Sequence, residues 1–484
     1  MIKNEGKINY DVIVIGAGHA GCEAALASAR NGAGTLLISI NMDSIALMPY
    51  SSTVGGFGRG QLIREIDVLG GEISKNIDKN YIHMRTIVSK EDPAIETMEA
   101  VVDKRRYFLS MKEVLENQDN LYLRQGLVAG IEEIGKKYNI YTSDGITYCC
   151  KSIVICTGTF LGAKIFWGGN TIEAGRQGEI CSKKLLFSLE NLGFKFGRLK
   201  NYTAPLIDRK SINVKVLEKQ SYDRNPQMFS YENNFDGRRQ LYSYITNTGK
   251  DCTRYILKSI NKKAASSCKI KSETTENCFP IEDKVLKFED KKDYMIDILP
   301  IGRDTNEVYL KGLETALSEE IQVGMLKKIK SLKCAEITRP GYGVEFNYLL
   351  PFQLTSDLES KKFKGIFFAG HINGTNGYQE SAAQGIVAGL AAYRKVKNLE
   401  SIIIRREDGY IGVLISDLVV KGVNEPYRML VSRNEYSFYH RHDNADIRML
   451  KFIEKLGNKD KAIKIINKYK KKRSMFHVKH KIIY

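Results

Sequence analysis

The sequence predicts an α/β fold in which a Rossmann-like sheet carries an inserted domain and is followed by a short helical region. Three segments support this prediction, because each has the pattern of a strand that runs into a glycine-rich turn. These segments are residues 10–21, 151–162 and 364–392. Since long stretches of chain separate them, a sheet built from all three must be interrupted by inserted structure.

The first segment has the complete context of a dinucleotide-binding motif. Residues 10–15 (YDVIVI) are apolar and β-branched, which is typical of a strand buried on both faces. The turn GAGHAG follows, and the alanine-rich residues 22–32 then predict a slim helix. Residues 35–39 (TLLIS) predict the second strand. This order of elements predicts a helix N-terminus that binds phosphate.

Each glycine of the turn has its own physical task. Gly16 permits the tight turn, Gly18 lets a pyrophosphate approach the backbone, and Gly21 lets the helix and strand pack closely. The acidic residue that often follows the second strand is absent, and Ser39 and Asn41 stand there instead. We therefore expect the Asn41 side chain to supply the hydrogen bond to the ribose.

The two later segments favour FAD over NAD. A nicotinamide dehydrogenase needs one local motif, whereas a chain that returns to the same site much later in the sequence is typical of a flavoprotein. We therefore predict a two-dinucleotide-binding-domain flavoprotein, in which Gly16, Gly158 and Gly370 converge on one flavin at the carboxyl ends of the strands. The predicted FAD-binding residues are Gly16, Gly18, Gly21, Asn41, Thr157, Gly158, Thr159, Gly370, Asn373, Gly374, Gly377 and Gln384.

Small residues also shape the helix predicted at the end of the third segment. Gly385 and Gly389, together with neighbouring alanines, keep this helix thin. A thin helix can approach a ring system or a packed strand, and we interpret the two glycines in that way. Tight packing between helices is the alternative.

Length and composition indicate a globular protein of several domains. The chain has 484 residues, of which 43% are hydrophobic and 27% charged, so wholesale disorder is not expected. No apolar run approaches the ~20 residues of a membrane span, and the N-terminus lacks the apolar core of a signal peptide. We therefore expect a cytoplasmic protein without a membrane partner.

The nine cysteines are irregularly spaced, which predicts reduced thiols and no metal site.

The net charge of +18 predicts attraction to a polyanion. A nucleic acid is the favoured partner, and a lysine-rich composition with evenly spread charge is the alternative. The densest positive stretch is residues 468–481, near the C-terminus. It is interpreted either as a solvated end or as a nucleic-acid arm.

Chain order predicts three parts. A discontinuous FAD-binding domain comprises residues 1–205 and 345–395. Residues 206–344 form a strand-rich inserted domain that carries the nicotinamide-facing surface. Residues 396–484 form a truncated helical region that ends in the basic tail.

Longer stretches of the sequence resemble one family over about residues 8–450. They include DVIVIGAGHAGCEAALA, GGFGRGQLIREIDVLGG, RPGYGVEF, FFAGHINGTNGYQESAAQG, EPYRMLVSRNEY and DNADIR. In this order they resemble the bacterial tRNA uridine 5-carboxymethylaminomethyl modification enzymes. The chain is identified as a divergent and C-terminally shortened member of that family.

The resemblance implies a homodimeric FAD enzyme that uses NADH as reductant and methylenetetrahydrofolate as one-carbon donor. Its substrate would be the wobble uridine of certain tRNAs, and a GTPase would act as its partner. A base in an anticodon loop must be exposed for this chemistry, which suits a basic protein with aromatic platforms. The residues that the resemblance implicates in substrate binding are Arg176, Arg339, Glu345, Arg428 and Arg433.

The chain departs from the family pattern at one catalytic position. The family has a cysteine just before the glycine pair at 55–56, and Tyr50 stands in its place. A phenol is mostly protonated at neutral pH and cannot replace a thiolate nucleophile. The family's second cysteine is kept as Cys278, which is either the remaining catalytic nucleophile or a structural thiol.

A second departure reverses the charge of one segment. Where the family has basic residues, this chain reads EDPAIETMEA, with Glu91, Asp92, Glu96 and Glu99. We interpret this segment as a helix whose acidic face repels an RNA backbone. An exposed helix whose charges vary freely is the alternative.

Two smaller departures affect the substrate side and the C-terminus. The family has two glutamates after its Gly-Tyr pair, and this chain has Gln379 and Glu380. The family also continues with a long helical region that engages the GTPase, so the shorter C-terminal region argues against that partner.

Two functions therefore remain open at the level of sequence. One is FAD-dependent modification of C5 of a tRNA uridine, which we favour. The other is a flavin-binding paralogue that has lost RNA modification and serves as an NADH oxidase, a redox sensor or a regulatory module.

Overall fold

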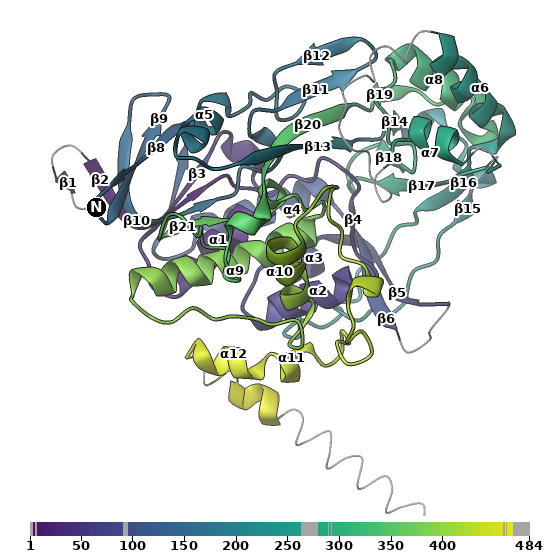
Figure 1. Cartoon of the computed structure of the whole chain (residues 1–484). Coiled ribbons are helices and arrows are strands. Elements are labelled where there is room, and N and C mark those ends of the chain that lie inside the picture. The colour runs from purple at the N-terminus through teal and green to yellow at the C-terminus, as the bar shows by residue number, and fades with distance from the viewer. Residues whose placement is uncertain are drawn as a thin grey trace, which may run out of the picture.

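The computed structural model describes residues 3–4, 7–90, 95–262, 279–288, 290–291, 293–457, 460 and 462–467. These residues form an α/β fold in which helices pack against four sheets (Figure 1). The predicted fold class is thereby confirmed. Within the same ranges, no helix is both long and apolar enough to cross a membrane.

The largest sheet has eight strands, and its order is β7-β3-β2-β10-β9-β8, with β1 paired to β2 and β21 paired to β10. Strands β7, β3, β2, β10 and β21 run parallel, whereas β1, β9 and β8 pair antiparallel to their neighbours. The strands are β1 (Lys3–Asn4), β2 (Lys7–Ile15), β3 (Thr35–Ser39), β7 (Leu121–Gln125), β8 (Val128–Ile134), β9 (Lys137–Thr142), β10 (Thr147–Ile155) and β21 (Ile366–Phe368).

The parallel strands bring the three predicted turns to one end of this sheet. Ile155, at the end of β10, lies opposite both Ile15 of β2 and Phe368 of β21. All three side chains are buried, as expected for strands covered on both faces. The segments that follow these strands therefore lie together, although they are far apart in the sequence.

Two helices pack closely beside these turns: α1 (His19–Arg30) and α9 (Tyr378–Val396) (Figure 1). A Cβ atom on Gly385 would lie 2.2 Å from the Ala20 carbonyl oxygen, and one on Gly389 would lie 2.3 Å from that of Ala24. The Ser28 hydroxyl also donates to the Gly389 carbonyl at 2.9 Å. Both glycines therefore serve helix packing, and the interpretation that they approach a ring system or a strand is wrong.

Two smaller sheets flank the central one. The first has the order β12-β11-β20-β13, and the second has the order β4-β6-β5. Their strands are β4 (Thr53–Gly55), β5 (Tyr81–Val88), β6 (Glu96–Val102), β11 (Lys164–Trp167), β12 (Asn170–Ile172), β13 (Phe196–Tyr202) and β20 (Gly343–Leu349).

A six-stranded sheet with its own hydrophobic core lies apart from the central sheet (Figure 1). Buried Ile207, Ile256, Ile296, Leu310 and Leu326 belong to this core. Its strands, in the order of the sheet, are β15 (Glu218–Lys219), β16 (Tyr244–Asn247), β17 (Met295–Pro300), β18 (Glu307–Lys311), β14 (Leu206–Asp208) and β19 (Ile337–Arg339). The helices from this part of the chain are α6 (Gly249–Lys262), α7 (Ile281–Lys287) and α8 (Glu319–Lys328).

The other helices connect or cover the sheets. They are α2 (Arg59–Val68), α3 (Ile73–Asn80), α4 (Lys104–Glu116), α5 (Lys183–Asn191), α10 (Tyr410–Ser416), α11 (Ala445–Arg448) and α12 (Leu450–Lys455). A π-helical turn, Asp417–Lys421, continues α10.

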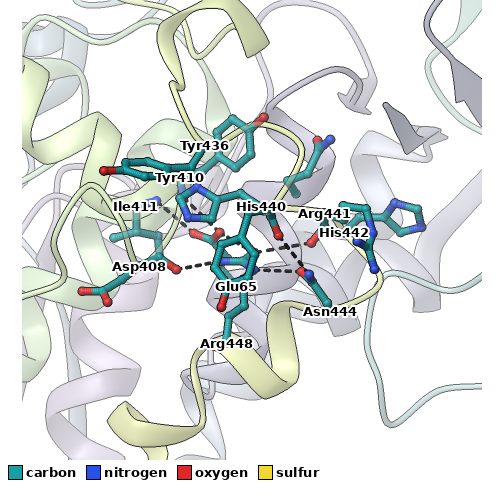
Figure 2. Close-up of polar contacts among 12 residues, drawn as sticks. Glu65, Asp408, Tyr410, Ile411, Tyr436, His440, Arg441, His442, Asn444 and Arg448 are labelled. Atoms are coloured by element: carbon teal, nitrogen blue, oxygen red, sulfur yellow. Dashed lines mark hydrogen bonds and ion pairs between the residues drawn. The ribbon is translucent and has the colours of Figure 1, made fainter. Parts of the chain in front are cut away.

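A buried ion pair attaches the C-terminal helices to α2 (Figure 2). Arg448 Nη2 donates to Glu65 Oε1 at 2.9 Å, and the two side chains are 2% and 0% exposed. The same carboxylate accepts hydrogen bonds from the backbone N–H groups of Tyr410 and Ile411, at the start of α10. Removal of either partner would leave a buried charge unpaired, so this cluster fixes α10 and α11 to the N-terminal half of the chain.

The acidic segment that we expected to form a helix is a strand instead. Glu96 begins β6, and Glu99 lies opposite Arg85 of β5 in an antiparallel pair. Arg85 Nη2 lies 2.6 Å from Glu99 Oε1, so a basic neighbour compensates the charge of this carboxylate. The strand is favoured because β4 and β5 supply partners on both sides of β6. Glu91 and Asp92 lie outside the described residues.

Candidate functional site

The first glycine turn leaves a helix N-terminus open to a ligand. Gly18 is the N-cap of α1, with no side-chain cap and no acidic residue in the first turn of the helix. A Cβ atom on Gly18 would meet nothing within 4 Å, whereas one on Gly21 would lie 1.7 Å from the Gly16 carbonyl oxygen. Gly16 has a φ of 100°, which favours glycine. The three glycines thus have the geometry of a phosphate-binding turn.

A cavity opens beside this turn, and we call it the turn cavity. It is lined by the segments that follow four parallel strands: β2, β3, β10 and β21. Its lining includes Gly16, Gly18, His19, Ser39, Asn41, Tyr50, Thr157, Gly158, Thr159, Arg176, Ala369, His371 and Tyr378. Ligands of parallel α/β sheets bind at this end of the strands.

One end of the Asn41 side chain already forms a hydrogen bond within its own turn. Its Oδ1 atom accepts from the Asp43 backbone N–H at 2.9 Å and caps the 3-10 helix Met42–Ser44. The Ser39 hydroxyl donates to the Asn41 carbonyl at 3.0 Å. Since Asn41 lines the turn cavity, its amide NH₂ group is the part of the side chain that remains suited to donate to a ribose oxygen.

Two buried polar atoms in the wall of the turn cavity have no hydrogen-bond partner among the described residues. They are Thr157 Oγ1 and His19 Nε2. Buried polar groups are nearly always satisfied in folded proteins, so such atoms in a cavity wall indicate a ligand. Together with the uncapped helix and the open Gly18, they fit a group with phosphates and polar ring atoms.

His19 lies between two tyrosine rings. Its ring centroid is 4.7 Å from that of Tyr378 and 5.6 Å from that of Tyr107. Burial lowers the pKa of His19 to about 3, and His371 acts in the same direction. The imidazole is therefore neutral at physiological pH. We did not single out His19 from the sequence, although it lies inside the GAGHAG motif.

The predicted residues of the last glycine segment lie mostly behind the wall of the turn cavity. Gln384 Oε1 accepts from the Gly370 N–H at 3.2 Å and from Asn373 Nδ2 at 2.9 Å. Asn373 Nδ2 also donates to the Phe368 carbonyl at 2.7 Å. These bonds hold the turn in shape, while the neighbouring Ala369 and His371 line the cavity. A direct role of Gly370, Asn373, Gly374, Gly377 and Gln384 in cofactor binding stays a prediction.

Tyr50 separates the turn cavity from a second cavity, which we call the side cavity. Tyr50 and Tyr378 line both. The Tyr50 backbone N–H donates to the Tyr378 hydroxyl at 3.0 Å, and Lys104 Nζ donates to the Tyr50 carbonyl. Burial, with a smaller contribution from Arg339, lowers the pKa of Lys104 to about 7. The residue that replaces the family cysteine thus lies where the two cavities meet.

The five predicted substrate residues do not converge on one point. Arg176 lines the turn cavity and pairs with Glu179 at 2.6 Å, whereas Arg428 lines the side cavity. Arg339 lines another cleft with Arg105 and Arg106 of α4, and it pairs there with Glu307 at 2.9 Å. Arg176 lines this cleft as well. Glu345 is buried on β20, 2.9 Å from Arg198. Arg433 packs on the Tyr427 ring. Cys278 lies outside the described residues.

The fold and the turn cavity define the class of this protein. A parallel sheet with a glycine turn, an open helix N-terminus and a returning glycine segment is a Rossmann-type flavoprotein fold.

Comparison with known proteins identifies the family. The model of the family described as glucose inhibited division protein A matches residues 11–400. A Geobacillus kaustophilus protein named tRNA uridine 5-carboxymethylaminomethyl modification enzyme MnmG is 46% identical over 449 residues, which cover 93% of this chain and 71% of the relative. A Clostridium kluyveri protein of the same name is 43% identical over 93% of this chain and 72% of its own length.

A solved structure agrees with this match. Aquifex aeolicus GidA superimposes with a TM-score of 0.91 and 37% sequence identity, over 98% of this chain and 78% of that chain. The chain therefore belongs to the GidA family.

Proposed function

We propose that this chain is an FAD-dependent enzyme that modifies C5 of a uridine in tRNA. The observation that carries the proposal is membership of a family whose relatives are named as tRNA uridine modification enzymes, combined with an open dinucleotide turn. The net charge of +18 suits an RNA substrate.

The residues of the turn cavity would hold FAD by its polar groups. The N–H groups at the start of α1 would bind the pyrophosphate, and the Asn41 amide would bind a ribose oxygen. Thr157 Oγ1 and His19 Nε2 have no described partner, so each is available to the cofactor. Bound FAD supplies hydride-transfer chemistry, which the protein does not have without it.

The proposal includes two co-substrates, NADH as reductant and methylenetetrahydrofolate as one-carbon donor. It also includes a discontinuous FAD domain at residues 1–205 and 345–395, an inserted domain at 206–344 and a helical region at 396–484. We propose a homodimer in the cytoplasm, and the proposal leaves a GTPase partner out.

The nucleophile that activates the uridine is assigned to Cys278 within this proposal. Tyr50 lies at the junction of the two cavities, but its phenol is not a substitute for a thiolate. The replacement of the family cysteine by Tyr50 favours a second candidate function, a flavin-binding paralogue that has lost RNA modification.

Nucleoside analysis of tRNA tests the proposal. A strain that lacks this gene should lose a C5-modified uridine, and a plasmid copy should restore it. A copy that carries Gly18→Val should not restore it, because the valine side chain would occupy the space in front of the helix N-terminus. An unchanged nucleoside profile in the deletion strain would favour the paralogue.

A further inference from the structure

The cleft that Arg105, Arg106 and Arg339 line, which we call the arginine cleft, lies between α4 and strands of the six-stranded sheet. It has a volume of about 940 Å³. Leu47 and Arg176 line both this cleft and the turn cavity. The two spaces therefore adjoin, and a ligand that reaches the turn cavity can extend into the arginine cleft.

Guanidinium groups stand along the arginine cleft, and two of them already hold a carboxylate. Arg106 Nη2 lies 2.7 Å from Asp304 Oδ2, and Arg339 Nη2 lies 2.9 Å from Glu307 Oε2. Arg105 lines the cleft without an ion pair to any residue that the structure describes. Because the planar guanidinium fork matches a carboxylate, this row of arginines suits a ligand with more than one carboxylate.

The pair between Arg106 and Asp304 is open to exchange. Its side chains are 53% and 77% exposed, and exposed ion pairs contribute little to stability. A carboxylate of a bound ligand can therefore replace Asp304 beside Arg106 at a small cost in free energy.

The backbone of the arginine cleft does not offer the phosphate site that a dinucleotide uses. The N-terminus of α4 is capped, because Asp103 Oδ1 accepts from the Arg106 backbone N–H at 3.0 Å. The other oxygen of this carboxylate accepts from the Arg303 N–H at 2.8 Å. Phosphates bind open helix N-termini such as that of α1, so recognition in this cleft is left to side chains.

Apolar side chains occupy the part of the cleft beside the turn cavity. Leu47 and Pro49 line both spaces, and Phe108 and Leu109 of α4 line the cleft. Leu109 is 50% exposed. Together with the arginines, these residues suit an elongated ligand that has an apolar ring and a tail of carboxylates. The volume is near the upper end of that of small-molecule sites, which also favours a long ligand.

We propose that the arginine cleft binds the glutamate tail of the folate co-substrate, with Arg105 and Arg106 pairing with the carboxylates of the tail. The proposal rests on the proposed function, which includes a folate one-carbon donor. A folate has the required chemistry, since an aromatic ring joins its pteridine to one or more glutamates and each glutamate adds a carboxylate. The pteridine end is then directed toward the turn cavity.

Binding of folates with tails of different length tests this proposal. The probes are the monoglutamate and the pentaglutamate of 5-formyltetrahydrofolate, an air-stable relative of the donor, and calorimetry gives their Kd for the full chain saturated with FAD. The wild type should bind the pentaglutamate about tenfold more tightly at low salt, because additional carboxylates reach the arginines. The difference should shrink at high salt, since these charges are exposed.

Variants of the cleft should change the affinity in opposite directions. Arg105→Gln and Arg106→Gln should each weaken binding of the pentaglutamate by about fivefold, with a smaller effect on the monoglutamate. Asp304→Asn should instead tighten binding of the pentaglutamate by about threefold, because it frees Arg106 from its present partner. A gain in affinity cannot come from misfolding.

Arg254→Gln is the matched control. Arg254 is an exposed helical arginine of α6 that pairs with Asp251 at 3.3 Å, three residues before it, as Arg106 does with Asp103 at 3.7 Å. It does not line the arginine cleft. This variant should bind both folates as the wild type does.

Three results would overturn the proposal. They are equal affinity of the wild type for the two folates, unchanged pentaglutamate affinity in all three cleft variants, and arginine variants that weaken binding of NADH as much as that of the pentaglutamate. A wild type that binds neither folate would count against the folate co-substrate of the proposed function, and this proposal would fail with it.

Discussion

His19, in the wall of the turn cavity, makes the free energy of unfolding of the protein depend on pH. The buried imidazole has a pKa of about 3 in the folded chain, because burial disfavours its charged form, and an ordinary pKa of 6.5 when the chain unfolds. Between these values the unfolded state binds a proton that the folded state does not. The free energy of unfolding therefore falls as pH falls below about 6.5, by about 2 kcal/mol for this one group at pH 5.

His19→Phe should remove this part of the pH dependence. Phenylalanine keeps the stacking between Tyr107 and Tyr378 but binds no proton. Urea unfolding at pH 7.5 and pH 5 should show a loss of stability about 2 kcal/mol smaller in the variant than in the wild type. Tyr107→Phe, which keeps the imidazole, should behave as the wild type does. Equal losses in wild type and His19→Phe would contradict this account.

Single residues were the least predictable part of the site. The glycines at 16, 18 and 21 could be assigned because their tasks are local to the turn. The environment of His19 could not, because Tyr107 and Tyr378 reach it from distant helices. For the same reason, the sequence could not show that Asn373 and Gln384 hydrogen-bond to each other behind the cavity wall.

The start of α1 combines two glycines with opposite steric demands. A Cβ atom on Gly18 would enter open space, and one on Gly21 would collide with the Gly16 carbonyl oxygen. Gly18 has a φ of −73°, which any residue can adopt. The same substitution at the two positions should therefore separate ligand binding from folding.

Gly18→Ala should keep the thermal stability of the flavin-free protein but raise the Kd for FAD by about tenfold or more, because its methyl group would stand before the pyrophosphate. Gly21→Ala should lower the free energy of unfolding by about 3 kcal/mol, because it pushes the helix off the turn. Calorimetry of the flavin-free proteins and a fluorescence titration with FAD measure the two effects. A stable Gly21→Ala protein, or full FAD affinity in Gly18→Ala, would contradict the assigned roles.

Helices and strands were predictable where the sequence pattern is local. Their prediction failed where a distant segment supplies the hydrogen-bonding partner. The pattern at 35–39 predicts a strand, and β3 has the same bounds. We interpreted the acidic segment that includes Glu96 and Glu99 as a helix, but β4 and β5 lie on both sides of β6 and make it a strand. The opposition of Glu99 and Arg85 arises only from that pairing.

The whole molecule assembles one site from segments that the sequence keeps far apart. The parallel register of β2, β10 and β21 brings three glycine segments to one end of the central sheet, as the repeated strand-and-glycine pattern predicts. The position of the side cavity was not predictable, because its walls come from the insertion and from segments on both sides of it. Tyr50 and Tyr378 join the side cavity to the turn cavity only once the chain is folded.

The central claim is that this assembled cavity binds FAD that NADH can reduce. The most direct test is the absorption spectrum of the purified full chain under anaerobic conditions, with mass spectrometry of the cofactor released by heat. We predict a yellow protein that releases FAD, about one per chain, and whose flavin absorbance bleaches when NADH is added. A colourless protein that cannot be reconstituted with FAD would contradict the account.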